Sequence, residues 1–140
     1  MGFSAMLDFM NKDSFSIEMK VRDYECDMQG IVNNAIYQNY LEHARHEFLH
    51  SAGLSFAELT SRGVIVVVIR AELDYRQALR SGDDFRVSVS VRQVSRLKIV
   101  FDQQIIKLSG GEPVLEAQIT ATSLNERGRP YFPEELKALL

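Results

Sequence analysis

The sequence of residues 1–140 predicts a single α+β domain, in which a five-stranded antiparallel sheet wraps around one long central helix and a short helix follows. Five segments have the alternation or the β-branched content of strands, and one long segment has apolar residues at helical spacing. Turns rich in glycine, serine and aspartate separate the later strands, which favours antiparallel hairpins. One helix covers one face of a sheet, so the other face and the edges are left to solvent or to another subunit.

The first strand and the long helix follow from the periodicity of apolar residues. Residues 15–21 alternate between apolar and polar side chains, as a strand with one solvated face does. Asn33 or Asn34 can cap a helix, and Gly53 supplies its end. A short second helix is expected over residues 56–61. The apolar stripe of the long helix consists of Tyr37, Tyr40, Leu41, Ala44 and Phe48.

The next strand is apolar on both faces. Residues 64–69 form an unbroken run of Val and Ile, which is too β-branched for a helix and predicts a buried strand continuing to Tyr75. Because successive side chains of a strand point to opposite faces, both faces of this run need to be covered. We therefore expect a homodimer or a homotetramer.

Three further strands are expected at residues 85–94, 97–108 and 114–124. The turns at residues 81–84 and 109–113 contain residues that tolerate positive φ or restrict the backbone, as tight turns require. Pro133 precedes two glutamates, a pattern typical of the first turn of a helix, so a short helix is expected over residues 133–137.

Composition and charge exclude several classes of function. The net charge of −3 argues against nonspecific binding to nucleic acid, because a phosphate backbone favours clustered Lys and Arg. No apolar run is long enough to span a bilayer, and residues 1–12 lack the basic start and long apolar core of a secretory signal. Cys26 is the only cysteine, so no intrachain disulfide is expected and a reducing compartment is the simplest interpretation. We expect a cytoplasmic protein whose partners are small molecules or other proteins.

The most informative stretch for function is residues 24–34. Asp27 lies one short loop, containing Gly30, before the predicted start of the long helix, where backbone N–H groups are unpaired. A carboxylate can attack a carbonyl or activate water, while such N–H groups bind the oxygen that becomes negative in acyl transfer. On the residues alone, an Asp at this position is more often a turn or capping residue.

Other candidate groups fit catalysis less well. Cys26 lies between two acids, which disfavour a thiolate, and no histidine is adjacent to it in the sequence. Four residues of the long helix have the spacing of metal ligands, but they lie on its polar face, so we expect no metal site and no cofactor. These four are His43, His46, Glu47 and His50.

The pattern of acid, glycine, apolar pair and helix in residues 24–45 is similar to that of a known family. The matching residues are Asp27, Gly30, Ile31, Val32, Tyr37, Glu42, Ala44 and Arg45. With weaker support from Tyr75 and from residues 79–83 and 129–136, the chain resembles the hotdog-fold acyl-CoA thioesterases of the 4-hydroxybenzoyl-CoA thioesterase class. The resemblance implies a hotdog fold and metal-independent hydrolysis of an acyl-CoA to a carboxylic acid and free coenzyme A. It also implies an acyl pocket between subunits, with coenzyme A lying across the surface.

The resemblance implies roles for individual residues. Asp27 matches the catalytic acid, which acts as nucleophile or general base, and the backbone N–H of Asn34 matches the group that polarises the thioester carbonyl. Many relatives carry an aromatic residue and a histidine in place of Asn33 and Asn34, and we expect at least one of these asparagines to cap the helix. The implied substrate-binding residues are Gly30, Ile31, Val32, Asn33 and Tyr37, with Arg96 and Lys98 near the phosphates of the coenzyme.

Several alternatives remain open from the sequence. Some hotdog enzymes place the catalytic carboxylate on the central helix, where this chain has Glu42, although an ion pair with Arg45 or His46 is the simpler interpretation. A closely related activity is hydrolysis of thioesters of acyl carrier protein. A hydratase or dehydratase on the same fold needs a histidine with a carboxylate, and a noncatalytic acyl-binding protein needs neither.

Overall fold

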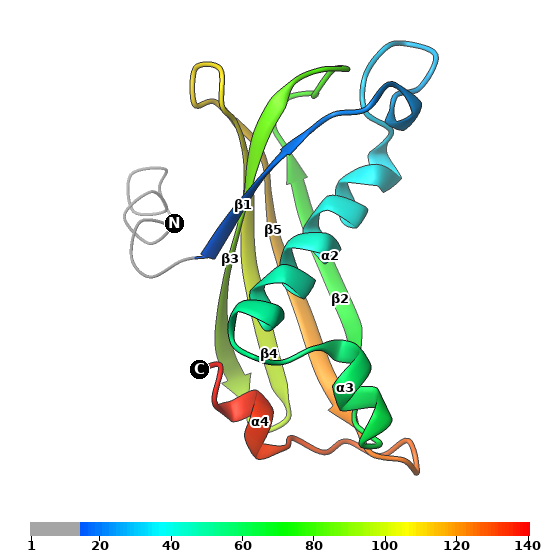
Figure 1. The fold of residues 1–140 in the computed structure, drawn as a ribbon, viewed down its shortest axis with the longest axis vertical. Coiled ribbons are helices and arrows are strands. Elements are labelled where there is room, and N and C mark those ends of the chain that lie inside the picture. Colours follow the sequence, from blue (N-terminus) through cyan, green and yellow to red (C-terminus); the bar gives the residue numbers. More distant parts are fainter. Residues whose placement is uncertain (1–14) are drawn as a thin grey trace.

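The computed structural model describes residues 15–140, in which one antiparallel sheet carries a long helix across one of its faces (Figure 1). The strands lie in the order β1-β3-β4-β5-β2, so β1 and β2 are the edges of the sheet. They are β1 (Phe15–Lys20), β2 (Ile65–Tyr75), β3 (Asp84–Ser95), β4 (Lys98–Lys107) and β5 (Pro113–Leu124). The predicted five-stranded antiparallel sheet is therefore confirmed. The expectation about residues 1–12 lies outside the described residues.

The helices also match the predicted segments. The long helix α2 (Asn34–Ser51) lies diagonally across the sheet, and α3 (Phe56–Ser61) and α4 (Glu134–Lys137) lie at one end of the molecule (Figure 1). A short 3-10 helix, η1 (Asp23–Glu25), precedes the loop that leads into α2 and was not predicted from the sequence. None of the helices within residues 15–140 is long and apolar enough to cross a membrane.

The core lies between α2 and the inner face of the sheet. Strand register brings alternate residues into line on this face, for example Val87 opposite Ile105 and Ile105 opposite Leu115. Tyr40 and Leu41 from α2 pack into the same core and are almost fully buried. Because side chains alternate between faces, a register shift of one residue would move this apolar set to the outer face.

A buried polar contact joins α2 to the middle of the sheet. Arg45 donates a hydrogen bond from its guanidinium to the side-chain oxygen of Gln103 at 2.9 Å, and Gln103 donates to the carbonyl of Leu41 at 3.0 Å. The Arg45 guanidinium also lies 5.9 Å from the centre of the Phe101 ring. Burial lowers the pKa of Arg45. These contacts give α2 a defined position along β4, because a buried polar group needs its partners.

The strand β2 differs from its prediction. Val64 is buried, but Val68 and Ile69 are 50% and 48% exposed, because β2 pairs with β5 on one side only. A register shift between Val68 and Arg70 interrupts this pairing at Ile69. The prediction of a strand buried on both faces is therefore wrong for the single chain. Such an exposed apolar edge strand is a surface suited to pairing with another chain.

Candidate active site

A tight turn presents Asp27 just before α2. The Asp27 N–H donates to the carbonyl of Ile31 at 2.9 Å, and the Gly30 N–H donates to the carbonyl of Asp27 at 3.0 Å. Gly30 has a φ of 80°, which an L side chain rarely adopts. One oxygen of the Asp27 carboxylate accepts from the Gln29 N–H at 2.8 Å. Asp27 is exposed, and within residues 15–140 its other carboxylate oxygen has no hydrogen-bond partner.

The turn leads directly into the capped start of α2. The Asn33 side-chain oxygen accepts from the Ala35 N–H at 3.0 Å, so the prediction that an asparagine caps the helix is confirmed. The carbonyl of Asn33 accepts from the Ile36 N–H at 2.9 Å. The Asn34 N–H has no acceptor among residues 15–140 and belongs to the positive end of the helix dipole. An exposed carboxylate thus lies seven residues before a free N–H group at a helix start.

Short antiparallel pairing holds the two sides of the Asp27 turn together. Cys26 forms an isolated bridge with Val32, and the Asn33 N–H donates to the carbonyl of Glu25 at 3.0 Å. The side chain of Glu25 is buried, and its Oε1 accepts from the Tyr40 hydroxyl of α2 at 2.8 Å. The turn is therefore tied both to the first residue before α2 and to a side chain farther along that helix.

A second loop, at residues 76–83, packs against the first. The carbonyl of Leu79 accepts from the Val32 N–H at 2.9 Å, and Ile31 forms a bridge with Arg80. The Leu79 N–H donates to the hydroxyl of Tyr37 at 3.0 Å. These contacts fix the backbone of residues 31–32, between the Asp27 turn and α2.

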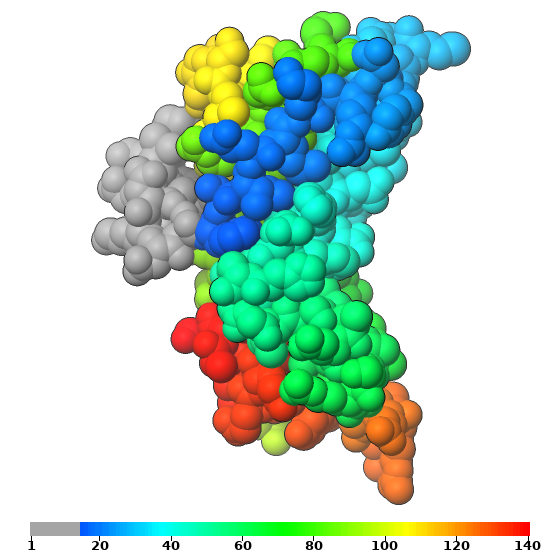
Figure 2. All heavy atoms as spheres, in the orientation of Figure 1, coloured from blue at the N-terminus to red at the C-terminus, as the bar shows by residue number. Residues whose placement is uncertain are grey.

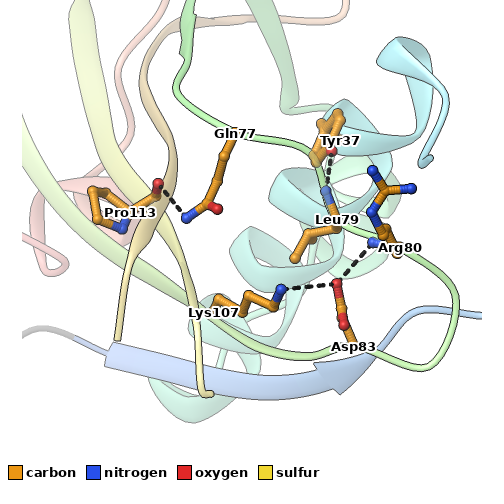
Figure 3. Close-up of polar contacts among 7 residues, drawn as sticks. All are labelled: Tyr37, Gln77, Leu79, Arg80, Asp83, Lys107 and Pro113. Atoms are coloured by element: carbon orange, nitrogen blue, oxygen red, sulfur yellow. Dashed lines mark hydrogen bonds and ion pairs between the residues drawn. The ribbon is translucent and has the colours of Figure 1, made fainter. Parts of the chain in front are cut away.

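Two further contacts hold the second loop to the sheet, as Figure 3 shows. The Gln77 side chain donates to the carbonyl of Pro113 at 3.2 Å. Asp83 accepts from the Arg80 N–H at 2.8 Å and lies 3.6 Å from the Lys107 ammonium. The second loop is thus attached to the sheet near both of its ends, and its middle contacts residues 31–32.

The predicted substrate-binding residues near the turn differ in exposure. Gly30 and Asn33 are exposed and Ile31 is half-buried. Val32 and Tyr37 lie in the core and are 1% and 2% exposed. The hydroxyl of Tyr37 is occupied by the Leu79 N–H, and burial raises its pKa. The side chains of Val32 and Tyr37 therefore pack in the core behind the Asp27 turn and are not exposed on its surface.

Glu42, the alternative catalytic acid on α2, makes a simple surface contact. Glu42 is exposed and lies 3.6 Å from the His46 imidazole, an ion pair when that histidine is protonated. This confirms the interpretation of Glu42 as an ion-pair partner of His46. Within residues 15–140 no group of three His, Cys, Asp or Glu residues, including His43, Glu47 and His50, is arranged to hold a metal ion.

Arg96 and Lys98 lie far from Asp27 in the same chain. They flank the β3–β4 hairpin, whereas the Asp27 turn lies beside the start of β3, so the two regions are at opposite ends of the molecule (Figure 2). The 12 residues of β3 separate them, which is roughly 35 Å of extended strand. Within one chain, the structure does not bring these two basic residues to the Asp27 turn.

Two long-range hydrogen bonds position the site, and the sequence did not predict either of them. Glu25 and Tyr40 form a hydrogen bond across 15 residues of sequence, and Tyr37 and Leu79 form one across 42 residues. The only signal for Glu25 was its place within residues 24–34. Tyr40 was recognised only as a member of the apolar stripe of the helix, and Tyr37 was expected to bind substrate rather than to hold the second loop.

The chain is similar in sequence to several known proteins. A sequence model of the thioesterase-like superfamily matches residues 21–140. The chain is 43% identical over 123 residues to the chloroplastic acyl-acyl carrier protein thioesterase ATL3 of Arabidopsis thaliana, covering 87% of this chain and 65% of that protein. It spans 61% of a second Arabidopsis thaliana relative. It is also 30% identical to the long-chain acyl-CoA thioesterase FadM of Escherichia coli, over 74% of this chain and 77% of that protein.

A solved structure shows the same fold. The 1,4-dihydroxy-2-naphthoyl-CoA thioesterase from Synechocystis superposes with a TM-score of 0.85 at 19% identity, covering 90% of this chain and 94% of that chain. The predicted hotdog architecture, a five-stranded antiparallel sheet with one long helix packed against it, is therefore confirmed.

Proposed function

Because the chain belongs to the thioesterase-like superfamily, we propose that it hydrolyses an acyl thioester to a carboxylic acid and a free thiol, with Asp27 as nucleophile or general base. One observation carries the proposal. The exposed Asp27 carboxylate leaves one oxygen unused in its own turn, and the same loop runs into the free Asn34 N–H at the start of α2. Acyl transfer requires such a pair, a base or nucleophile together with a donor for the developing negative charge.

The chemistry follows from the two groups. Asp27 either attacks the carbonyl carbon and forms an acyl anhydride, which water then cleaves, or removes a proton from a water that attacks directly. In both routes the carbonyl oxygen becomes negative and accepts a hydrogen bond from the Asn34 N–H. The carbon–sulfur bond breaks, the thiol takes up a proton, and the acid retains an oxygen from water. Loss of one such donor in other acyl-transfer enzymes lowers kcat by about 10²–10³.

The thiol carrier has two candidates. The resemblance to acyl-CoA thioesterases implies coenzyme A, and the 30% identity to FadM, named as a long-chain acyl-CoA thioesterase, supports it. The 43% identity to ATL3, named as an acyl-acyl carrier protein thioesterase, supports a carrier protein instead. Turnover of one acyl chain presented on coenzyme A and on a carrier protein separates them, because a tenfold preference in kcat/KM corresponds to about 1.4 kcal/mol of differential transition-state binding.

The site also bears on the proposed homodimer or homotetramer. The β2 edge exposes Ile65, Val68 and Ile69, and pairing of two β2 edges would cover them. If Arg96 and Lys98 contact the coenzyme's phosphates, they must do so from a second chain, given their distance from Asp27 in the same chain. Light scattering that detects only a monomer at micromolar concentration would contradict this assembly. Because a single cysteine allows no intrachain disulfide and suits a reducing compartment, we propose that the protein is cytoplasmic.

The decisive experiment replaces Asp27 by Asn. The amide oxygen of Asn can still accept from the Gln29 N–H, so the turn is retained while the nucleophile or base is lost. We expect normal folding and a fall in kcat of at least about a thousandfold, as loss of such a group produces. The matched control is Glu42→Gln, which also converts an exposed acid to an amide and leaves activity unchanged. A fully active Asp27→Asn variant refutes the assignment, and loss of activity in Glu42→Gln moves the role to α2.

A further inference from the structure

Glu25 is a buried carboxylate that the proposed chemistry does not use. It is 8% exposed, yet its Oε1 accepts two hydrogen bonds, from the Arg22 N–H and from the Tyr40 hydroxyl, both at 2.8 Å. The second oxygen lies 4.0 Å from the Arg22 guanidinium. Burying a carboxylate is costly unless hydrogen bonds compensate it, and here two donors converge on one oxygen.

Only one of these contacts is explained by local structure. The bond from the Arg22 N–H closes the start of η1 and would exist without any neighbouring element. The bond from Tyr40 crosses from the loop to α2, where the Tyr40 ring is 2% exposed and packs 4.6 Å from the Phe85 ring. The Tyr40 hydroxyl is therefore held by the core and provides a fixed point for the loop.

The backbone of Glu25 contacts the same helix. Its carbonyl accepts from the N–H of Asn33, the residue that caps α2. Glu25 thus contacts the N-cap of α2 through its backbone and, about two turns later, Tyr40 of α2 through its side chain. Asp27 lies two residues after Glu25, on the turn that begins at these two contacts.

We propose that Glu25 is a positioning residue, which, together with Tyr40, clamps the Asp27 turn onto α2 and so fixes the Asp27 carboxylate relative to the Asn34 N–H. This inference rests on the proposed function, because it assigns Glu25 a purpose in the same site. A displacement of about 1 Å between reacting groups can lower a rate by about a hundredfold. Burial, and to a smaller extent the hydrogen bond to Glu25, raises the pKa of Tyr40 well above its usual value. The hydroxyl therefore stays protonated and remains a donor at neutral pH.

Three variants test the clamp. Tyr40→Phe keeps the ring in the core and removes only the donor to Glu25. Glu25→Ala removes the acceptor, whereas Glu25→Gln retains an oxygen that can accept from both the Arg22 N–H and the Tyr40 hydroxyl. The control for general destabilisation is Ser123→Ala, which removes a buried hydroxyl that donates to the carbonyl of Tyr131 at the opposite end of the sheet.

Steady-state kinetics gives the first measurement. Tyr40→Phe and Glu25→Ala should each lower kcat by about tenfold to a hundredfold with KM changed by less than about threefold, since the chemical groups stay but their placement is lost. Glu25→Gln should lose less than Glu25→Ala, and Ser123→Ala should keep the wild-type kcat. An unchanged kcat in Tyr40→Phe, or a rise in KM alone, overturns the proposal.

Amide hydrogen exchange gives a second measurement that does not depend on activity. The N–H groups of Asp27, Val32 and Asn33 are all hydrogen-bonded, so their exchange reports opening of the turn. Tyr40→Phe should accelerate their exchange by about tenfold, as loss of about 1.4 kcal/mol of local stability predicts, while Ser123→Ala should not. If no thioester is hydrolysed but exchange accelerates, the proposed function fails and the clamp stands. If kcat falls without faster exchange, the clamp is refuted.

Discussion

Replacing Tyr37 by Phe isolates one buried hydrogen bond that joins α2 to the second loop of the site. The Tyr37 hydroxyl accepts from the Leu79 N–H at 3.0 Å, and these residues are 2% and 0% exposed. A phenyl ring keeps the contacts with Tyr40 and Tyr75, whose ring centres lie 6.1 Å and 5.5 Å away. The change therefore leaves packing almost intact and leaves a buried N–H without an acceptor, which costs about 1–3 kcal/mol.

For a domain of this length we expect the Tm to fall by about 3–12 °C, and urea unfolding to show the same loss without a change in its slope. The control is Tyr131→Phe, because Tyr131 is 48% exposed and lies at the other end of the sheet. A free energy of unfolding for Tyr37→Phe within about 0.5 kcal/mol of wild type, which is the range of ordinary surface substitutions, refutes the reasoning. Since the hydroxyl is occupied, KM should stay unchanged; a raised KM would show that Tyr37 contacts the substrate.

Further predictions concern the cap, the charges and the pH dependence. Asn33→Ala should lower the free energy of unfolding by about 1 kcal/mol, whereas Asn33→Asp, which keeps a capping oxygen, should lower it less. Reversing the charges of Arg96 and Lys98 should raise KM for acyl-CoA more than it lowers kcat, and an unchanged KM would leave them as solvated hairpin residues. Burial raises the pKa of Tyr40 in the folded protein, so as the pH rises this hydroxyl ionises in the unfolded chain first. The free energy of unfolding should therefore stay constant below a pH of about 10 and fall above it. Urea unfolding measured at several pH values should show a smaller fall for Tyr40→Phe.

Local patterns were sufficient to predict most of the elements. The helix α2 begins where Asn33 offers a cap, and α3 occupies the same six residues that the sequence indicated. The exposure of β2 could not be predicted in this way. Its Val and Ile residues indicate a strand, but the sequence does not tell whether both neighbours of that strand come from the same chain, and the structure places it at an edge.

The same limit applies within the site. The tight turn at Asp27 and the capping role of Asn33 depend on residues two to four apart, which sequence reasoning can assess. The roles of Glu25, Tyr37 and Tyr40 depend on contacts between distant segments. A tyrosine in an apolar stripe is equally compatible with a plain core position, and only the fold shows which hydroxyl meets which loop.

Tyr37 and Tyr40 together explain why the site has a defined shape although two loops form it. They lie three residues apart on α2 with their rings in edge contact, and each hydroxyl holds one loop, through Glu25 or through Leu79. The loops are joined to each other where the Val32 N–H meets the Leu79 carbonyl. A small shift of α2 would therefore carry both loops with it and preserve the relation between the carboxylate and the helix start. The site geometry is thus set by the packing of one face of α2 against the sheet. Substitutions in the core under α2 should alter catalysis only where they change the distance between the Tyr37 and Tyr40 hydroxyls.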